Sequence, residues 1–374
     1  MLNLLNVSFP KGTGIEGLVY VVLDWLTSSG MAYILAVVLF TVMLKLVLLP
    51  LDFGNRYFTK KNQLFMQKIA PEEAELRKIF GNDPVAFNRA KQDLYRRNGG
   101  GQAGFCLFML INLVLTLVVF LSVFSGLRAI GNYNTYEQTR EIYAVYNGDY
   151  ASDEEKNAAI IAKYDETTVS FLWVKNVWQP DTGASPVLTY KQFEAIEKTY
   201  LEEGVSEISE EDYNAMFAPI LETKGASGWN GYFLLVALAG AVTFASIAIN
   251  TKLNNAKSKN KVVAQEEAGY SIRKVREAAD ANAMPQVNPA MANNMMKVIM
   301  PIIMIFFTIS STSAMSVYII ANSVVGTLLT LGSGFIVDAM LARSAKKKEE
   351  TVGDDTPKIN PHAKYFKTTA TKKK

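Results

Sequence analysis

The apolar residues of this chain are gathered in blocks that are long enough to cross a lipid bilayer. A transmembrane helix needs about 20 apolar residues, because each residue adds about 1.5 Å and the hydrocarbon core is about 30 Å thick. The blocks cover residues 31–51, 105–127, 229–250 and 298–337. The last block is too long for one span, and Ser310-Ser311-Thr312-Ser313 interrupts it. It therefore predicts a hairpin of two spans, which makes five in all.

Five spans place the two termini on opposite sides of the membrane, and the Lys and Arg content of the connecting segments indicates the cytoplasmic side. Segment 52–104 carries 10 basic and 6 acidic residues, and segment 251–297 carries 8 and 4. Segment 131–228 carries 7 basic and 18 acidic residues, whereas the tail after Leu341 carries 10 and 4. All four segments predict an external N-terminus and a cytoplasmic C-terminus.

The segments between the spans have helical patterns of their own. Residues 14–27 are apolar but include two acids, which favours an interfacial helix on the external face. The alternative, that they extend a tilted first span, stays open. Two helical stretches on either side of a turn at 81–84 predict a cytoplasmic hairpin. The external segment has three short helical stretches, and its β-branched and aromatic residues 169–178 suggest a small α+β lobe.

The predicted fold is an all-α polytopic membrane protein, with five transmembrane helices around a cytoplasm-open hydrophilic groove, a cytoplasmic hairpin and a small external lobe. The expected parts are an external interfacial helix (1–30), span one (31–51), the cytoplasmic hairpin (52–104), span two (105–127), the acidic external lobe (128–228), span three (229–250), a cytoplasmic loop (251–297), spans four and five (298–337) and a basic cytoplasmic tail (338–374).

The composition argues against most enzyme classes. The single cysteine, Cys106, lies inside a predicted span, and the single histidine, His362, lies in the basic tail. Zinc sites, haem sites and catalytic triads therefore lack their usual ligands or bases. We expect no enzyme activity, no catalytic residue, no cofactor and no bound metal.

Lys45 is the one charged residue of the first span. A lysine near the bilayer centre costs about 2.5–3.5 kcal/mol on insertion scales, so it usually has a function or reaches the interface through its long stem. Lys45 lies about 9 Å from the cytoplasmic end of the span, at 1.5 Å per residue, which leaves both interpretations open.

The other spans carry polar residues at helical spacing, at a depth similar to that of Lys45. Together they predict a wet cavity in the inner half of the membrane, although Ser and Thr also hold helices together without any further function. The residues expected to line this groove are Lys45, Thr41, Asn112, Thr116, Thr243, Ser246, Ser323 and Thr327; Asn250 and Thr330 continue two of the stripes.

A pocket of this kind would attract an acidic or polar segment that arrives from the cytoplasm, and would lower the cost of moving that segment across. Two other classes of function remain. A small-solute transporter could use Lys45 to bind an anion, although the spans show no internal repeat or pair of broken helices. A structural scaffold could present the acidic lobe, in which case Lys45 would be dispensable.

Short motifs along most of the chain resemble the YidC insertase family and its mitochondrial Oxa and chloroplast Albino relatives. An apolar span with one basic residue just before Leu49-Pro50-Leu51 is the first of them, and Lys45 stands where the family usually has arginine. The others are Met66-Gln67, Ala70-Pro71-Glu72, Asp83-Pro84, Leu94-Tyr95-Arg96-Arg97, Gly104-Phe105-Cys106-Leu107, Phe171-Leu172-Trp173, Gln179-Pro180-Asp181, Met295-Met296 and Met300-Pro301.

The resemblance implies a bacterial inner-membrane insertase and chaperone, whose basic residue receives hydrophilic parts of nascent membrane proteins. It also implies a hairpin that helps to capture substrate, and partners that include lipid, the Sec translocon and the ribosome. The basic tail could bind ribosomal RNA or rest on anionic lipid. Lysine in place of arginine keeps the charge but lacks the planar fork that binds carboxylates through two hydrogen bonds.

Overall fold

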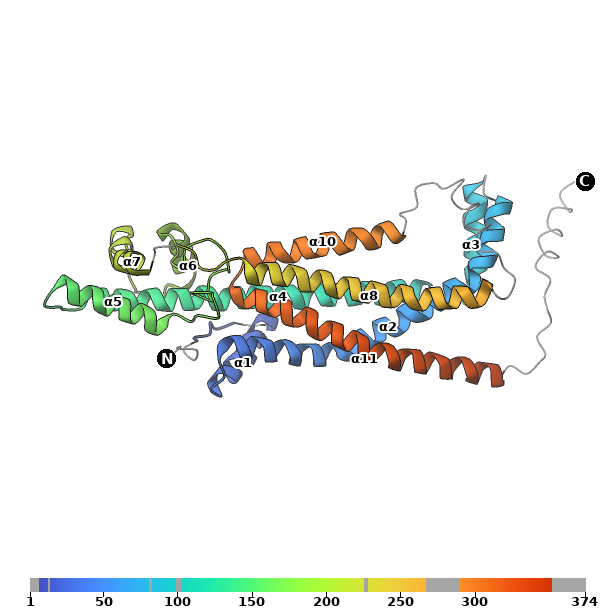
Figure 1. The fold of residues 1–374 in the computed structure, drawn as a ribbon, viewed down its shortest axis with the longest axis horizontal. Helices are drawn as coiled ribbons and strands as arrows, with labels where there is room; N and C mark the ends of the chain where they lie inside the picture. Colours follow the sequence, from blue (N-terminus) through green and yellow to red (C-terminus); the bar gives the residue numbers. More distant parts are fainter. Residues whose placement is uncertain are drawn as a thin grey trace, which may run out of the picture. The chain divides into compact units, whose positions relative to one another are not determined.

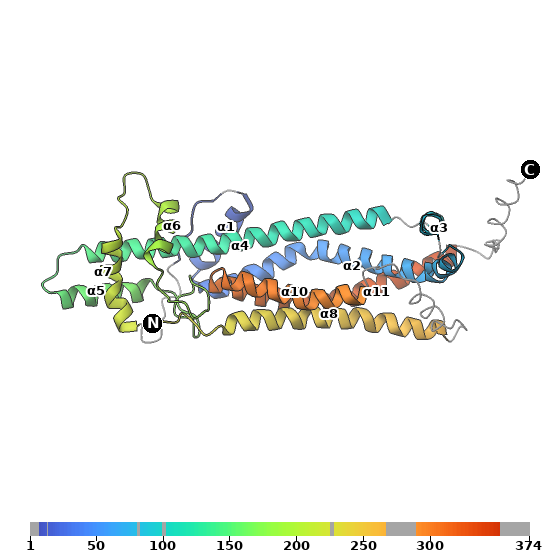
Figure 2. The ribbon, with the colours of Figure 1, turned by 90° about the horizontal axis from the view of Figure 1, so that it is seen from above.

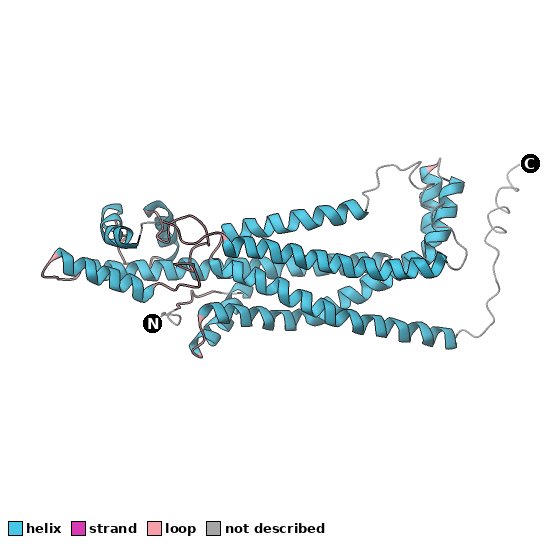
Figure 3. Cartoon of the chain, in the orientation of Figure 1, coloured by secondary structure: helices cyan, strands magenta, loops and turns pink. Residues whose placement is uncertain are grey.

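The computed structural model describes residues 7–12, 14–80, 83–98, 102–224, 228–266 and 289–351, and these ranges form helices and loops without a strand (Figure 3). The chain divides into two compact units, Met1–Thr330 and Leu331–Lys374. The helices are α1 (Gly14–Ser28), α2 (Tyr33–Phe80), α3 (Pro84–Arg97), α4 (Gln102–Tyr146), α5 (Asp153–Thr167), α6 (Tyr190–Tyr200), α7 (Glu210–Lys224), α8 (Leu234–Glu266), α10 (Pro289–Ile309) and α11 (Ser313–Thr351).

Four of these helices are long and apolar enough to cross a membrane, which agrees with an all-α polytopic protein. The apolar part of α10 within the described residues, Val298–Ile309, is shorter, so a fifth span remains a prediction. α10 ends at Ile309 and α11 begins at Ser313, and in the first unit α10 packs beside α8 (Figure 1). The four candidate spans are Tyr33–Met66, Leu110–Tyr146, Leu234–Lys252 and Ser313–Leu341.

Two of the span-containing helices continue well beyond their apolar segments. α2 runs past Leu51 as far as Phe80, so the predicted first span and the first arm of the hairpin form one helix of 48 residues. α4 similarly continues through 45 residues. Pro50 and Pro71 lie inside α2, where each removes one backbone hydrogen-bond donor. A change from apolar to charged residues does not by itself end a helix, because backbone hydrogen bonding continues across it.

α1 is a helix separate from the first span. The Thr27 hydroxyl donates to the Leu23 carbonyl (3.0 Å) in the last turns of α1, and Gly30 follows with a φ of +88°, which favours glycine. α1 packs against α2 and α4 (Figure 2). Leu23 is fully buried, whereas Leu18 and Trp25 are exposed. The helix therefore has one face packed on the protein and another apolar face that is uncovered.

The end of α2 and α3 form a helical hairpin with a small core of its own. Asp83 caps α3 by accepting from the backbone N–H groups of Val85 and Ala86. Fully buried Ile69 and largely buried Leu94 join the arms in this core. Glu73 of α2 pairs with the Lys91 ammonium at 2.5 Å and accepts from the Tyr95 hydroxyl at 3.2 Å. Gly99-Gly100-Gly101, which follows α3, lies outside the described residues.

The α+β lobe that residues 169–178 suggest is not confirmed, since the described residues form no strand and this segment contains an isolated bridge between Phe171 and Val174. Most apolar side chains of this segment, such as Val177 and Trp178, pack in a core with helices, whereas Leu172 is exposed. Tyr33 and Trp178 pack with ring centroids 5.0 Å apart, in a core shared by α1, α2, α4, α8 and α11. The backbone of Lys175 bonds to Asn230 instead of to a second strand.

Asp181 and Asn230 tie this loop to the beginning of α8. The fully buried Asp181 carboxylate accepts from the backbone N–H groups of Tyr232 (2.8 Å) and Leu235 (2.6 Å) and from the Trp173 indole (3.2 Å). A Cβ at position 231 would lie 1.8 Å from an Asp181 carboxylate oxygen, so only glycine fits there.

The side-chain amide of Asn230 donates to the backbone carbonyls of Asn176 (2.9 Å) and Pro180 (2.8 Å). The Ser313 hydroxyl, at the start of α11, donates to the carbonyl of Gln179 at 2.7 Å. The loop thereby fixes the first turns of the two helices that carry Thr243, Ser246, Ser323 and Thr327 of the predicted groove.

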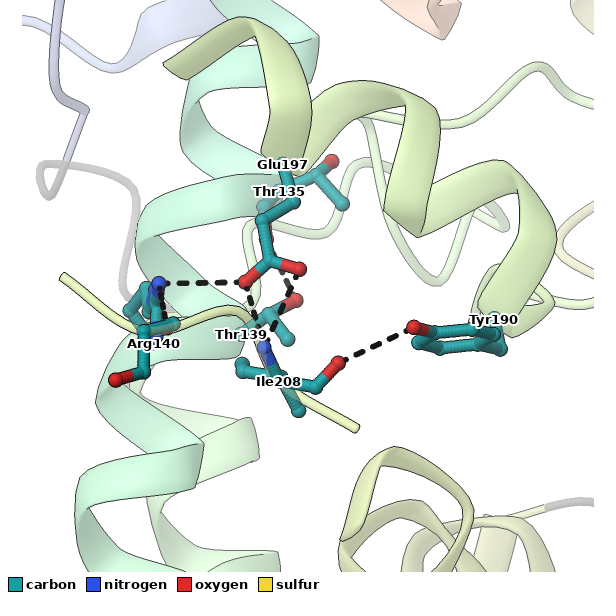
Figure 4. Close-up of polar contacts among 7 residues, drawn as sticks. Thr135, Thr139, Arg140, Tyr190, Glu197 and Ile208 are labelled. Carbon is teal, nitrogen blue, oxygen red and sulfur yellow. Dashed lines mark hydrogen bonds and ion pairs between the residues drawn. The ribbon is translucent and has the colours of Figure 1, made fainter. Parts of the chain in front are cut away.

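The C-terminal part of α4 forms a compact helical lobe with α5, α6 and α7. Its core includes fully buried Ile142, Phe193 and Met216. Figure 4 shows the buried carboxylate of Glu197 on α6, which pairs with Arg140 of α4 at 3.3 Å and accepts from the backbone N–H of Ile208 at 3.2 Å. This ion pair joins α4, α6 and the segment before α7.

We expect Asp181→Asn to lower the stability of the protein by about 2 kcal/mol. The NH2 group of the amide would replace one carboxylate oxygen, and it cannot accept the hydrogen bonds that this oxygen accepts. Thermal unfolding in detergent measures the change. Asp149→Asn makes the same substitution at an exposed position and should have little effect. Equal losses for both variants would contradict the role given to Asp181.

Glu197 should make stability depend on pH. Burial raises the pKa of Glu197, although the Ile208 N–H and Arg140 act to lower it. The folded protein therefore binds this proton more tightly than the unfolded chain, and stability should fall as the pH rises above 4.5, the ordinary value, through the folded pKa. Glu197→Gln should flatten this part of the curve of melting temperature against pH, whereas exposed Glu203→Gln should not. Curves of equal slope for Glu197→Gln and the unaltered protein would contradict this.

Candidate functional site in the membrane-spanning helices

Lys45 of α2 reaches across to α11. A Cβ built on Gly326 would lie 3.9 Å from both the Cε and the Nζ atoms of Lys45, so the ammonium group lies against the backbone of this glycine. No hydrogen bond or ion pair joins Lys45 to another residue within the described ranges. Gly326 leaves room for a charged group beside α11.

Hydroxyl groups join α8 and α11 close to Gly326. The hydroxyls of Thr243 and Ser323 are 3.3 Å apart, and those of Ser246 and Thr327 are 2.6 Å apart. Thr327 also donates to the Ser323 carbonyl at 2.8 Å, which leaves Ser246 to donate to Thr327. We call Thr243, Ser246, Ser323 and Thr327 the hydroxyl ladder. The ladder therefore follows the helix that Lys45 contacts.

The structure does not bring every predicted groove residue to this place. The buried Thr41 hydroxyl donates to the Val37 carbonyl of its own helix at 2.7 Å. Asn112 of α4 and Asn250 of α8 each have a buried side-chain oxygen that finds no hydrogen-bond partner among the described residues. Thr116 is exposed, among exposed leucines of α4. Within the described part of the chain, no cluster of His, Cys, Asp or Glu could hold a metal ion.

Two charged residues that the sequence analysis did not select lie near this site. Arg56 of α2 donates a hydrogen bond to the Thr330 hydroxyl of α11, and Asp52 lies one turn before Arg56 on α2. Asp52 attracts the Lys45 ammonium and Arg56 repels it. Both follow Lys45 at helical spacing, by 7 and 11 residues. This spacing identifies them once the helix is known to continue past Leu51.

The comparison with protein families agrees with the motifs in the sequence. A model of the family described as 60Kd inner membrane protein matches residues 25–338, which is most of the chain. The chain belongs to this family. The match includes Lys45, the hydroxyl ladder and all four candidate spans apart from the end of the last. The region that matches the family model therefore includes every residue of the polar site.

Several relatives of this family member are named Membrane protein insertase YidC. The protein of Clostridium perfringens is 26% identical over 161 residues, which are 43% of this chain and 50% of that protein. The protein of Geotalea daltonii is 37% identical over 81 residues, which are 22% and 14% of the two chains. The chain thus spans half or less of the length of these relatives. No solved structure matches it.

The contact between Ser246 and Thr327 should contribute to stability only weakly. Hydrogen bonds between membrane helices average about 0.6 kcal/mol in double-mutant cycles. We expect a coupling of that size between Ser246→Ala and Thr327→Val, measured by unfolding in detergent. Ser122→Ala is the control, because Ser122 donates to Val118 of its own helix (2.8 Å), and it should show no coupling to Thr327→Val. A Ser246 coupling near zero would contradict the contact.

Proposed function

We propose that the protein is a membrane protein insertase and chaperone that receives hydrophilic segments of nascent membrane proteins and releases their apolar segments to lipid. The observation that supports this most is the position of the Lys45 ammonium, beside Gly326 and next to the hydroxyl ladder. Membership of the 60Kd inner membrane protein family and the names of the relatives support the same function.

The chemistry of the site suits transient binding. The Lys45 charge attracts carboxylates and polar groups of an arriving segment, while the hydroxyl ladder offers hydrogen bonds that replace part of its hydration. Neither forms a covalent bond, so the segment can leave again. Leu113 and Leu117 on α4 are exposed apolar side chains that can pass apolar segments to lipid. The groove formed by these elements is part of the proposal.

The charge distribution supports an orientation with the N-terminus outside the cell and the C-terminus in the cytoplasm. The acidic segment 131–228 then faces outward, and the α2–α3 hairpin faces the cytoplasm, where it can meet nascent chains. The Sec translocon is a further proposed partner. The ribosome is a proposed partner of the basic tail, most of which, from residue 352 on, lies outside the described residues.

A small-solute transporter is the second candidate, since an unpaired ammonium can also bind an anion. The hydroxyl ladder argues against it, because its side chains are spread along α8 and α11 and do not converge on one small ligand. A scaffold that presents the lobe would need neither Lys45 nor the ladder.

Complementation of a bacterium depleted of its own insertase tests the proposal. We expect the protein with Lys45 or with Lys45→Arg to restore insertion of a small membrane protein. Lys45→Ala and Lys45→Glu should reduce insertion about tenfold or more, which corresponds to about 1.4 kcal/mol of lost attraction. Protease protection of the translocated tail measures insertion.

Lys68→Ala is the matched control, because Lys68 is exposed on the same helix, and it should rescue fully. Equal rescue by all four residues at position 45 would mean that Lys45 only reaches the interface, and would remove the central residue of the proposal.

A further inference from the structure

α2 carries three charged residues on one face. Asp52 and Arg56 follow Lys45 by 7 and 11 residues, and at 100° per residue all three lie within about 20° of one line along the helix. Along the axis, Lys45 and Arg56 are about 16 Å apart. Their side chains are long, however, so the positions of the charged heads have to come from their contacts.

These contacts bring the two charged heads together on α11. Lys45 reaches Gly326, and Arg56 donates to the hydroxyl of Thr330, four residues further along. Thr330 in turn donates to the Gly326 carbonyl at 2.6 Å. One helical turn of α11 therefore meets both heads, which makes their separation along the axis about 6 Å.

The charge of this site is not balanced. Asp52 is the acid that acts on both cations, but it forms no ion pair within 4 Å and accepts no hydrogen bond among the described residues. Arg56 and Lys45 repel each other. Neither cation has a carboxylate in contact, although both are partly buried. A carboxylate of a bound segment, placed beside Gly326 and Thr330, would reduce the repulsion between Lys45 and Arg56. It would not have to displace another carboxylate from either cation.

We propose that Lys45 and Arg56 form a two-cation site that prefers hydrophilic segments with two acidic side chains about 6 Å apart, and that Asp52 is a weak built-in competitor for it. In an extended chain, alternate residues are separated by about 6.6 Å and point to the same side, so the matching pattern is acid-x-acid. This site rests on the proposed insertase function and names the class of segment that it favours.

The test uses a small single-span protein with three translocated tails of equal length. One tail has Asp-x-Asp, one has the same two Asp residues seven positions apart, and one has Asn-x-Asn. The unaltered protein should insert the Asp-x-Asp tail about fivefold faster than the tail with separated Asp residues. Arg56→Gln should remove this preference by slowing the Asp-x-Asp tail to the rate of the tail with separated Asp residues, whereas Arg56→Lys should keep it.

Asp52→Asn should increase the Asp-x-Asp preference, because it removes the competitor. Glu72→Gln deletes one acid at an exposed position of the same helix and should leave the preference unchanged. Three results would overturn the two-cation site: no preference in the unaltered protein, an Arg56→Gln variant that slows all three tails equally, or a Glu72→Gln effect as large as that of Asp52→Asn. Failure of the unaltered protein to insert any of the tails would instead overturn the insertase function itself.

Discussion

Polar groups in membrane-spanning helices must find partners inside the protein, because hydrocarbon offers none. Buried charges outside the spans also need partners. The Asp181 carboxylate accepts three hydrogen bonds, and the Glu197 carboxylate accepts from the Ile208 N–H and pairs with Arg140, so both join elements that are distant in the sequence. Lys45 is different, since it lies between apolar helices without a hydrogen bond or ion pair among the described residues. The protein keeps its structural charges satisfied and leaves this one available.

The hydrogen bonds of Asp181 and Ser313 also help to explain the position of Lys45. Asp181 holds the first turn of α8, and Ser313 at the start of α11 bonds to the same loop. With their first turns fixed, α8 and α11 pair through the hydroxyl ladder, and Gly326 then faces Lys45. The loop, the ladder and the lysine thus form one chain of dependence. Replacing the lysine by arginine would add a planar fork, but the charge would stay in place.

The sequence predicts the features that depend on local pattern. Apolar blocks predict four of the spans, the Ser310–Ser313 run marks the break before α11, and the polar stripes contain both pairs of the ladder. Features that depend on packing could not be predicted. Residues 169–178 have strand-like composition but pair with Asn230 and no strand. Thr116 shares a stripe with Asn112 yet is exposed, and Arg56 was missed because the first span was taken to end at Leu51.

Photo-crosslinking of a stalled nascent membrane protein tests the central claim most directly. A photoreactive residue replaces either Ser323, which belongs to the hydroxyl ladder, or Leu328, which is exposed on the same helix five residues later. The account predicts that the hydrophilic tail of the substrate crosslinks mainly from position 323, and that Lys45→Ala weakens this product. A tail that crosslinks equally from both positions, or from neither, would contradict the claim that the lysine and the ladder receive it.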